Sequence, residues 1–114
     1  MTTNPTNLRA AGKRLWASVA DEYDLDEHES AILLEAARTV DLLTQLDAAV
    51  RRDGPLVSTD QGPKVHPAAV EARQQRITLA RLIAALRLPN EETGARPQRR
   101  GGARGSYGIR GAVK

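Results

Sequence analysis

Cysteine and phenylalanine are both absent from this 114-residue chain, and aromatic residues make up only 3% of it. Without cysteine, neither a disulfide framework nor a thiolate metal site can form. The aromatic side chains are Trp16, Tyr23 and Tyr107, so a core built from Ala, Leu, Val and Ile gains less burial per residue. A domain of this size buries only roughly two thirds of its unfolded surface. We therefore expect self-association to supply further burial.

Long apolar runs are missing as well. No stretch approaches the roughly 20 apolar residues that a membrane span needs. The N-terminal sequence MTTNPTNLRAAGKRL lacks the charged-then-apolar order of a secretory signal. These features predict a cytoplasmic protein that makes no membrane contact.

Charge is unevenly distributed along the chain. Residues 1–88 carry 11 Lys/Arg and 12 Asp/Glu, a balance of −1, whereas residues 89–114 carry six basic and two acidic residues, a balance of +4. Both of these acids, Glu91 and Glu92, come at the start of that segment. Such asymmetry is typical of a folded body with a cationic tail, and cationic tails most often meet nucleic acid.

Apolar spacing predicts three helices. The first covers Leu8 to Glu22, although Gly12 weakens its start. The second begins after Asp26, which forms a capping-box pattern with Glu29, and runs to Gly54. The third begins at Pro67 and ends at Pro89. The second and third helices carry apolar stripes wider than one packed face requires, which predicts packing on two sides.

A small β-hairpin is predicted between the second and third helices. Two short extended pieces, Leu56–Ser58 and Lys64–His66, flank the turn sequence TDQGP. The fold class is therefore mainly α: a flexible N-terminus at 1–7, a helical oligomerisation domain at 8–89 with a hairpin near 56–66, and a basic, disordered Gly/Arg-rich tail at 90–114. The residues expected at the interface between copies are Leu42, Leu46, Leu79, Leu82 and Leu86.

Residues suited to catalysis or metal binding are few. His66 precedes a proline, which favours an extended backbone and a place at a strand end or helix N-cap. His28 lies within the acidic sequence DEYDLDEHE at 21–29, and no HExxH spacing or phosphate-binding glycine loop is present. The acidic run is typical of a solvated cap region, or alternatively of a docking surface for a protein partner. We expect no enzyme activity, no cofactor and no metal site.

The tail is the strongest functional signal. Its cations can neutralise backbone phosphates, and Tyr107 can stack on an exposed base. A merely solvated tail is the alternative. We predict DNA contacts, which would read charge rather than sequence, from the tail and from three residues of the body: Arg96, Arg99, Arg100, Arg104, Arg110, Lys114, Lys13, Arg14 and Lys64.

The order of these features resembles the small subunit of tailed-phage terminases from about Leu8 to Pro89. The resemblance is carried by GKRLW, by YDLDEHESAILLEAARTVDLL, by DGPLVSTDQGPKVHPAAVEARQQR and by the helix end ALRLP. The most diagnostic part is LLEAARTVD followed by Gly, a short hairpin and a restart at Lys-x-His-Pro. The stretch QGPKVHPA resembles the hairpin-to-helix junction of this family.

The resemblance implies a helical protein that assembles into a homo-oligomeric ring and binds double-stranded viral DNA at the packaging start. It also implies a partner, the large terminase ATPase-nuclease, which the small subunit recruits and regulates in the host cytoplasm. No helix-turn-helix recognition helix is visible, so we expect DNA contact through the tail or the ring surface.

Two other functions fit the same residues. One is a small helical DNA-binding regulator, of repressor or antitoxin type, that acts as a dimer. The other is a structural protein of the phage head or neck. The mass of the oligomer separates a ring of roughly eight or more chains from a dimer.

Overall fold

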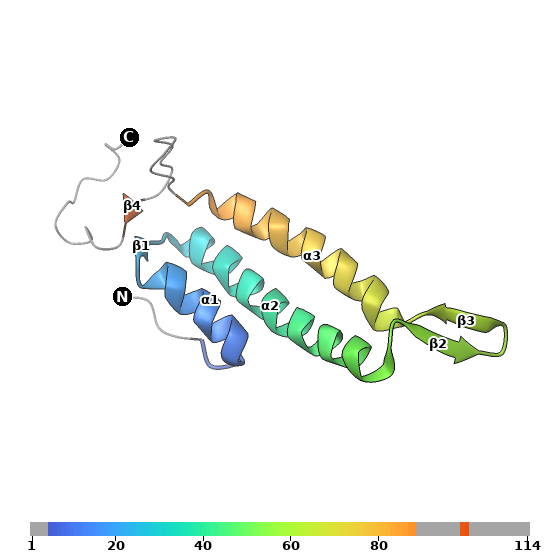
Figure 1. Cartoon of the computed structure of the whole chain (residues 1–114). Helices are drawn as coiled ribbons and strands as arrows, with labels where there is room; N and C mark the ends of the chain where they lie inside the picture. The colour runs from blue at the N-terminus through green and yellow to red at the C-terminus, as the bar shows by residue number, and fades with distance from the viewer. Residues whose placement is uncertain (1–4, 89–98, 101–114) are drawn as a thin grey trace.

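The computed structural model describes residues 5–88 and 99–100 of the chain (Figure 1). It confirms a mainly helical fold with an antiparallel hairpin between the second and third helices. The helices are α1 (Ala10–Ala20), α2 (Glu27–Asp53) and α3 (Pro67–Leu86), and the hairpin strands are β2 (Leu56–Thr59) and β3 (Gly62–Val65). The predicted flexible N-terminus at 1–7 and disordered tail at 90–114 fall mostly outside the described residues.

The start and the end of α2 agree with the sequence prediction. The Asp26 backbone N–H donates to Glu29 Oε1 over 2.8 Å, and the Asp26 side chain accepts from the Glu29 backbone, which completes the capping box. At the other end, Gly54 takes a positive φ of 84°, a conformation that costs glycine little. Its N–H donates to Val50 O over 2.7 Å. These two ends fix α2 at 27 residues.

The core lies along α2, which contacts both α1 and α3. Figure 1 shows α1 and α3 flanking this central helix. The buried apolar cluster joins all three helices and consists of Leu8, Trp16, Val19, Leu33, Ala37 and Leu86. None of the helices in the described part of the chain is long and apolar enough to cross a membrane.

A buried carboxylate of α2 caps the start of α1. Arg9 N–H donates to Asp41 Oδ2 and Gly12 N–H donates to Asp41 Oδ1, each over 2.7 Å. The first N–H groups of a helix have no partner within it, and Arg9 at the N-cap has no side-chain cap bond of its own. Asp41 supplies that cap from another helix, so it ties α1 to α2. Gly12 is buried at the contact, and the helix begins before it, at Ala10.

The hairpin extends away from the helices (Figure 1). Its register pairs Leu56 with Val65 and Thr59 with Gly62. The second strand therefore begins two residues earlier than predicted and ends one residue earlier. Leu56 and Val65 are 57% and 55% exposed. An isolated two-stranded ribbon is marginally stable, so this exposed apolar pair is a surface that a neighbouring molecule could cover.

A second pair of strands is absent from the sequence prediction. β1 (Tyr23–Asp24) and β4 (Arg99–Arg100) pair in antiparallel fashion. The sequence places residues 23–24 between the predicted first and second helices, and residues 99–100 in the predicted disordered tail. The structure thus corrects both assignments at these four residues.

Candidate nucleic-acid and assembly surfaces

The predicted DNA contacts of the tail fall into two groups. Arg96, Arg104, Arg110 and Lys114 lie outside the described residues. Arg99 and Arg100 form β4, opposite Asp24 and Tyr23. The fold therefore brings these two arginine positions next to the acidic run at 21–29.

The three predicted DNA contacts in the body do not form one patch. Lys13 and Arg14 are exposed on α1, whereas Lys64 is exposed on β3. Figure 1 places α1 and the hairpin in different parts of the molecule. These three cations therefore do not share one surface patch on a single chain.

Helix α3 and its C-cap present cations that the sequence analysis did not include among the DNA contacts. Arg73, Arg81 and Arg87 are exposed, and no ion pair with another described residue is found for them. By contrast, Arg76 is bonded to Asp47 across the α2–α3 contact over 2.8 Å. The available signal was that the predicted helix holds no acid three or four residues away from any of the three arginines, the spacing at which helical ion pairs form.

The leucines predicted at an interface between copies divide into three classes. Leu42 is 39% exposed on α2, and Leu46, Leu79 and Leu82 are half-buried. Leu86 is only 1% exposed, and it packs in the core of the single chain. The structure therefore leaves Leu86 no surface for a second copy, and Leu42 has the most.

The other apolar stripe of α3 faces away from the core. Apart from Ala69, the buried and half-buried positions of α3 recur at alternating spacings of four and three residues, namely Ala68, Ala72, Gln75, Leu79, Leu82 and Leu86. Val70, Ile77 and Ala84 recur every seven residues and are exposed, with Ile77 at 43%. A seven-residue spacing keeps side chains on one face of a helix. This stripe is an exposed apolar surface on α3.

His66 joins the ends of α2, the hairpin and α3. Its Nδ1 accepts from Ala68 N–H over 2.9 Å, which caps α3, and its backbone N–H donates to Pro55 O over 2.7 Å. Because Nδ1 accepts, the neutral ring carries its proton on Nε2, which donates to Asp53 Oδ2 over 2.9 Å. Both ring nitrogens therefore hold structural bonds, in the N-cap position that the sequence suggested.

Asp53 is the charged centre of this junction. Hydrogen bonds from Arg52 and then from His66 hold the pKa of its carboxyl well below the usual value. The same contact raises the pKa of Arg52. Asp53 and Arg52 form an exposed ion pair, a class that adds little stability. The Asp53 carboxylate orients His66 at the start of α3.

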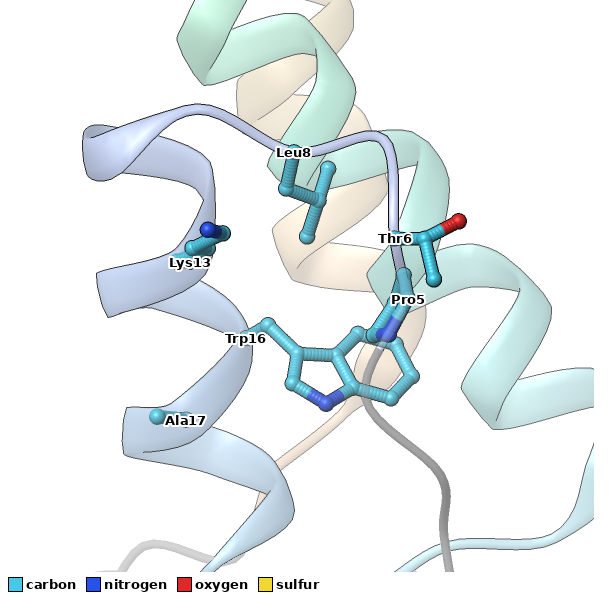
Figure 2. A pocket seen from close by; sticks show the side chains of 6 residues that line it. All are labelled: Pro5, Thr6, Leu8, Lys13, Trp16 and Ala17. Carbon is cyan, nitrogen blue, oxygen red and sulfur yellow. The ribbon is translucent and has the colours of Figure 1, made fainter.

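A cavity of about 390 Å³ lies beside α1. Figure 2 shows the Trp16 indole pointing from α1 toward the segment that carries Pro5 and Leu8. The Trp16 Nε1 is buried and has no hydrogen-bond partner among the described residues. Of the described residues that line the cavity, Lys13 alone is charged. Lys13, a predicted DNA contact, thus borders a cavity whose other described lining residues are uncharged, and no row of cations lines this cavity.

One group of side chains has the spacing of metal ligands. Ligand atoms of Asp26, His28 and Glu29 lie within 4.8 Å of one another. Asp26 and Glu29 already form the capping box of α2, which accounts for their proximity without an ion.

Comparison with known proteins gives no relative of this chain: no family model, curated protein or solved structure matches it.

Proposed function

We propose that this chain is a non-catalytic adaptor for viral DNA packaging, of the terminase small subunit type. In this proposal it forms a homo-oligomeric ring in the host cytoplasm, binds double-stranded DNA, and recruits and regulates the large terminase subunit. The observation that carries the proposal concerns the two faces of α3. One face packs on α2 and closes the core, and the other leaves apolar side chains exposed. Such a face is suited to a further copy of the chain.

Charge along α3 favours a ring over the dimeric regulator. If two α3 helices packed antiparallel about a two-fold axis at Ile77, Arg73 of each copy would lie opposite Arg81 of the other. A parallel pair would place each arginine beside its own equivalent. Like charges at such a contact are unfavourable, so this face is better suited to a different surface of the next copy. Repeated head-to-tail contacts close into rings when the rotation allows it.

The tail supplies the proposed DNA contacts. Removing residues 89–114 takes away six basic and two acidic residues and leaves a body with a balance of −1. Every phosphate that the protein no longer neutralises lowers the log-log salt slope by roughly 0.9 for duplex DNA. The truncated chain should therefore bind DNA more weakly and with a flatter salt dependence. A tail of the same composition in scrambled order should restore most of the binding, because backbone contacts depend on charge and reach.

The assembly is tested by the mass of a variant with a charge on the exposed face. Ile77→Glu places a carboxylate in an apolar contact, so light scattering should show a smaller species with unchanged helicity. Thr78→Glu is the matched control, since it adds the same charge at an exposed polar position of α3 that does not share a face with the adjacent Ile77, and it should keep the parent mass. A parent protein that is a monomer or a dimer would contradict the ring. An Ile77→Glu oligomer of parent mass would contradict this face.

The DNA-binding part is tested separately by a salt titration of the parent and the truncated chain. An unchanged slope after truncation would move the DNA site to the body, where Lys13, Arg14 and Lys64 are the predicted contacts and Arg87 is a further exposed cation. Failure of the scrambled tail beside a working native tail would mean that the tail reads a specific site or docks on the large subunit.

A further inference from the structure

The pairing of β1 with β4 joins the most acidic and the most basic parts of the chain. Figure 1 shows β4 beside β1, and the register of the two strands places Arg99 opposite Asp24 and Arg100 opposite Tyr23. Residues 21–29 contain six Asp/Glu and no Lys/Arg, whereas residues 95–114 contain six Lys/Arg and no acid. The strand pairing and the charge pattern are separate observations, and both bring the same two segments together.

The acidic side of this contact is held in place by the fold. Tyr23 packs against the core cluster, and Asp26 closes the capping box of α2. These two anchors hold the backbone of the segment between α1 and α2 in place. Asp21, Asp26 and Glu27 are exposed at this junction and can attract further cations.

The basic side is held by only two paired residues. A ladder of this length is marginal by itself, and the opposite charges of the two segments add an attraction. That attraction is weakened by salt. Duplex DNA presents a row of phosphates with a higher charge density than this segment, and it would draw on the same arginines.

We propose that the α1–α2 junction is an acidic docking site for the chain's own basic tail, and that DNA and this junction compete for the tail. The competition rests on the proposed function, because it needs the tail to bind DNA. The docking of the tail on the junction does not depend on the proposed function. A docked tail is not available to DNA, so the apparent affinity for DNA falls in proportion to the undocked fraction.

The first test neutralises acids at the junction. Asp21→Asn/Asp24→Asn is compared with Asp60→Asn/Glu71→Gln, which makes the same change in net charge at exposed positions on the hairpin turn and on α3. The junction variant should bind duplex DNA about twofold to tenfold more tightly than the control at low salt, as expected if half to nine tenths of the tails are docked. In chains cut after residue 88 the two variants should bind alike. Equal affinities in the full chains, or a difference that survives truncation, would overturn the competition.

The second test measures docking without reference to DNA affinity. Because the chain has no cysteine, Asp24→Cys/Arg99→Cys introduces the only pair that can form a disulfide. Under mild oxidation this pair should cross-link within one chain faster than Asp60→Cys/Arg99→Cys, the control pair on the hairpin turn, and added duplex DNA should slow the reaction. Equal rates for the two pairs, or cross-links only between chains, would overturn the docking.

These outcomes separate the two proposals. A junction pair that cross-links at a rate unaffected by DNA would overturn the competition. A parent chain that binds no DNA would overturn the proposed function, and the cross-linking rates would still decide whether the tail docks on the junction.

Discussion

A methyl group added at Gly12 tests how α1 is held on α2. A Cβ at this position would overlap Asp41 Oδ2 and would lie 2.7 Å from the backbone oxygen of Ala37. The Ala37 oxygen belongs to the backbone of α2 and cannot rotate away. The Asp41 carboxylate can move, but it then gives up bonds to Gly12 N–H and Arg9 N–H. Gly12→Ala should therefore separate α1 from α2 at the capped end.

The expected loss in unfolding free energy combines one stabilising term and two destabilising terms. Alanine is favoured over glycine within a helix by about 1 kcal/mol. Overpacking a close contact costs about 1–3 kcal/mol, and the loss of a hydrogen bond to a charged group costs about 1.5–3 kcal/mol. If one of the two Asp41 bonds is broken, the net destabilisation is roughly 1.5–5 kcal/mol. Packing therefore outweighs propensity, and the sign is opposite to that of an ordinary glycine-to-alanine change in a helix.

Urea unfolding followed by circular dichroism measures this loss, with all variants at one protein concentration because self-association adds to apparent stability. Asp41→Ala and the double variant complete a cycle, in which the double loss should be smaller than the sum because the carboxylate clash has gone. Ala17→Gly at an exposed position of α1 measures the propensity term in the same helix. A Gly12→Ala chain as stable as the parent would refute the reasoning.

Two further predictions concern the junction at His66. His66→Asn keeps a side-chain acceptor for Ala68 N–H and should keep the fold and the assembly, whereas His66→Ala should lose about 1 kcal/mol more through the missing cap; equal thermal stabilities would show that this cap is unimportant. For Asp53, the folded pKa lies below that of the unfolded chain, so its contribution to stability is present above the unfolded value of about 4 and is lost as pH falls through the folded value. The difference in unfolding free energy between the parent and Asp53→Asn should thus be constant near neutral pH and shrink below about pH 4, and a difference that persists into acid would contradict the pairing.

The parts of the fold that local chemistry determines could be predicted from the sequence. The Asp26–Glu29 capping box, the stop at Gly54 and the start at Pro67 each depend on residues within one turn of the helix end. The Asp41 cap could not be predicted in this way, because it is made between residues 29 and 32 positions apart. In the sequence, Asp41 is one acid within a long helix, and Gly12 looks like a weakness in the first helix. Only the approach of α1 to α2 gives both residues a role.

The strands β1 and β4 were missed for a related reason. Tyr23–Asp24 and Arg99–Arg100 are too short to show an alternating pattern, and more than seventy residues of chain separate the two strands. Charge was the one available signal, since the acidic run and the basic tail were each recognised. Opposite charge alone does not specify which residues of the two segments pair.

The two apolar stripes of α3 show that helical periodicity alone does not decide which stripe faces the core. Both stripes have helical spacing, so either could face α2, and the leucine-rich one was assigned to the interface between copies. The choice is decided by the α2–α3 pairing, in which Arg76 bonds Asp47 and Leu86 joins the same buried cluster as Leu33. These contacts turn Leu79, Leu82 and Leu86 inward and leave Val70, Ile77 and Ala84 outside. The larger side chains thus fill the single chain's own core, where burial gains most per residue. The surface left for a second copy is narrower, and it is flanked by Arg73 and Arg81, whose charges restrict which surface can pack on it.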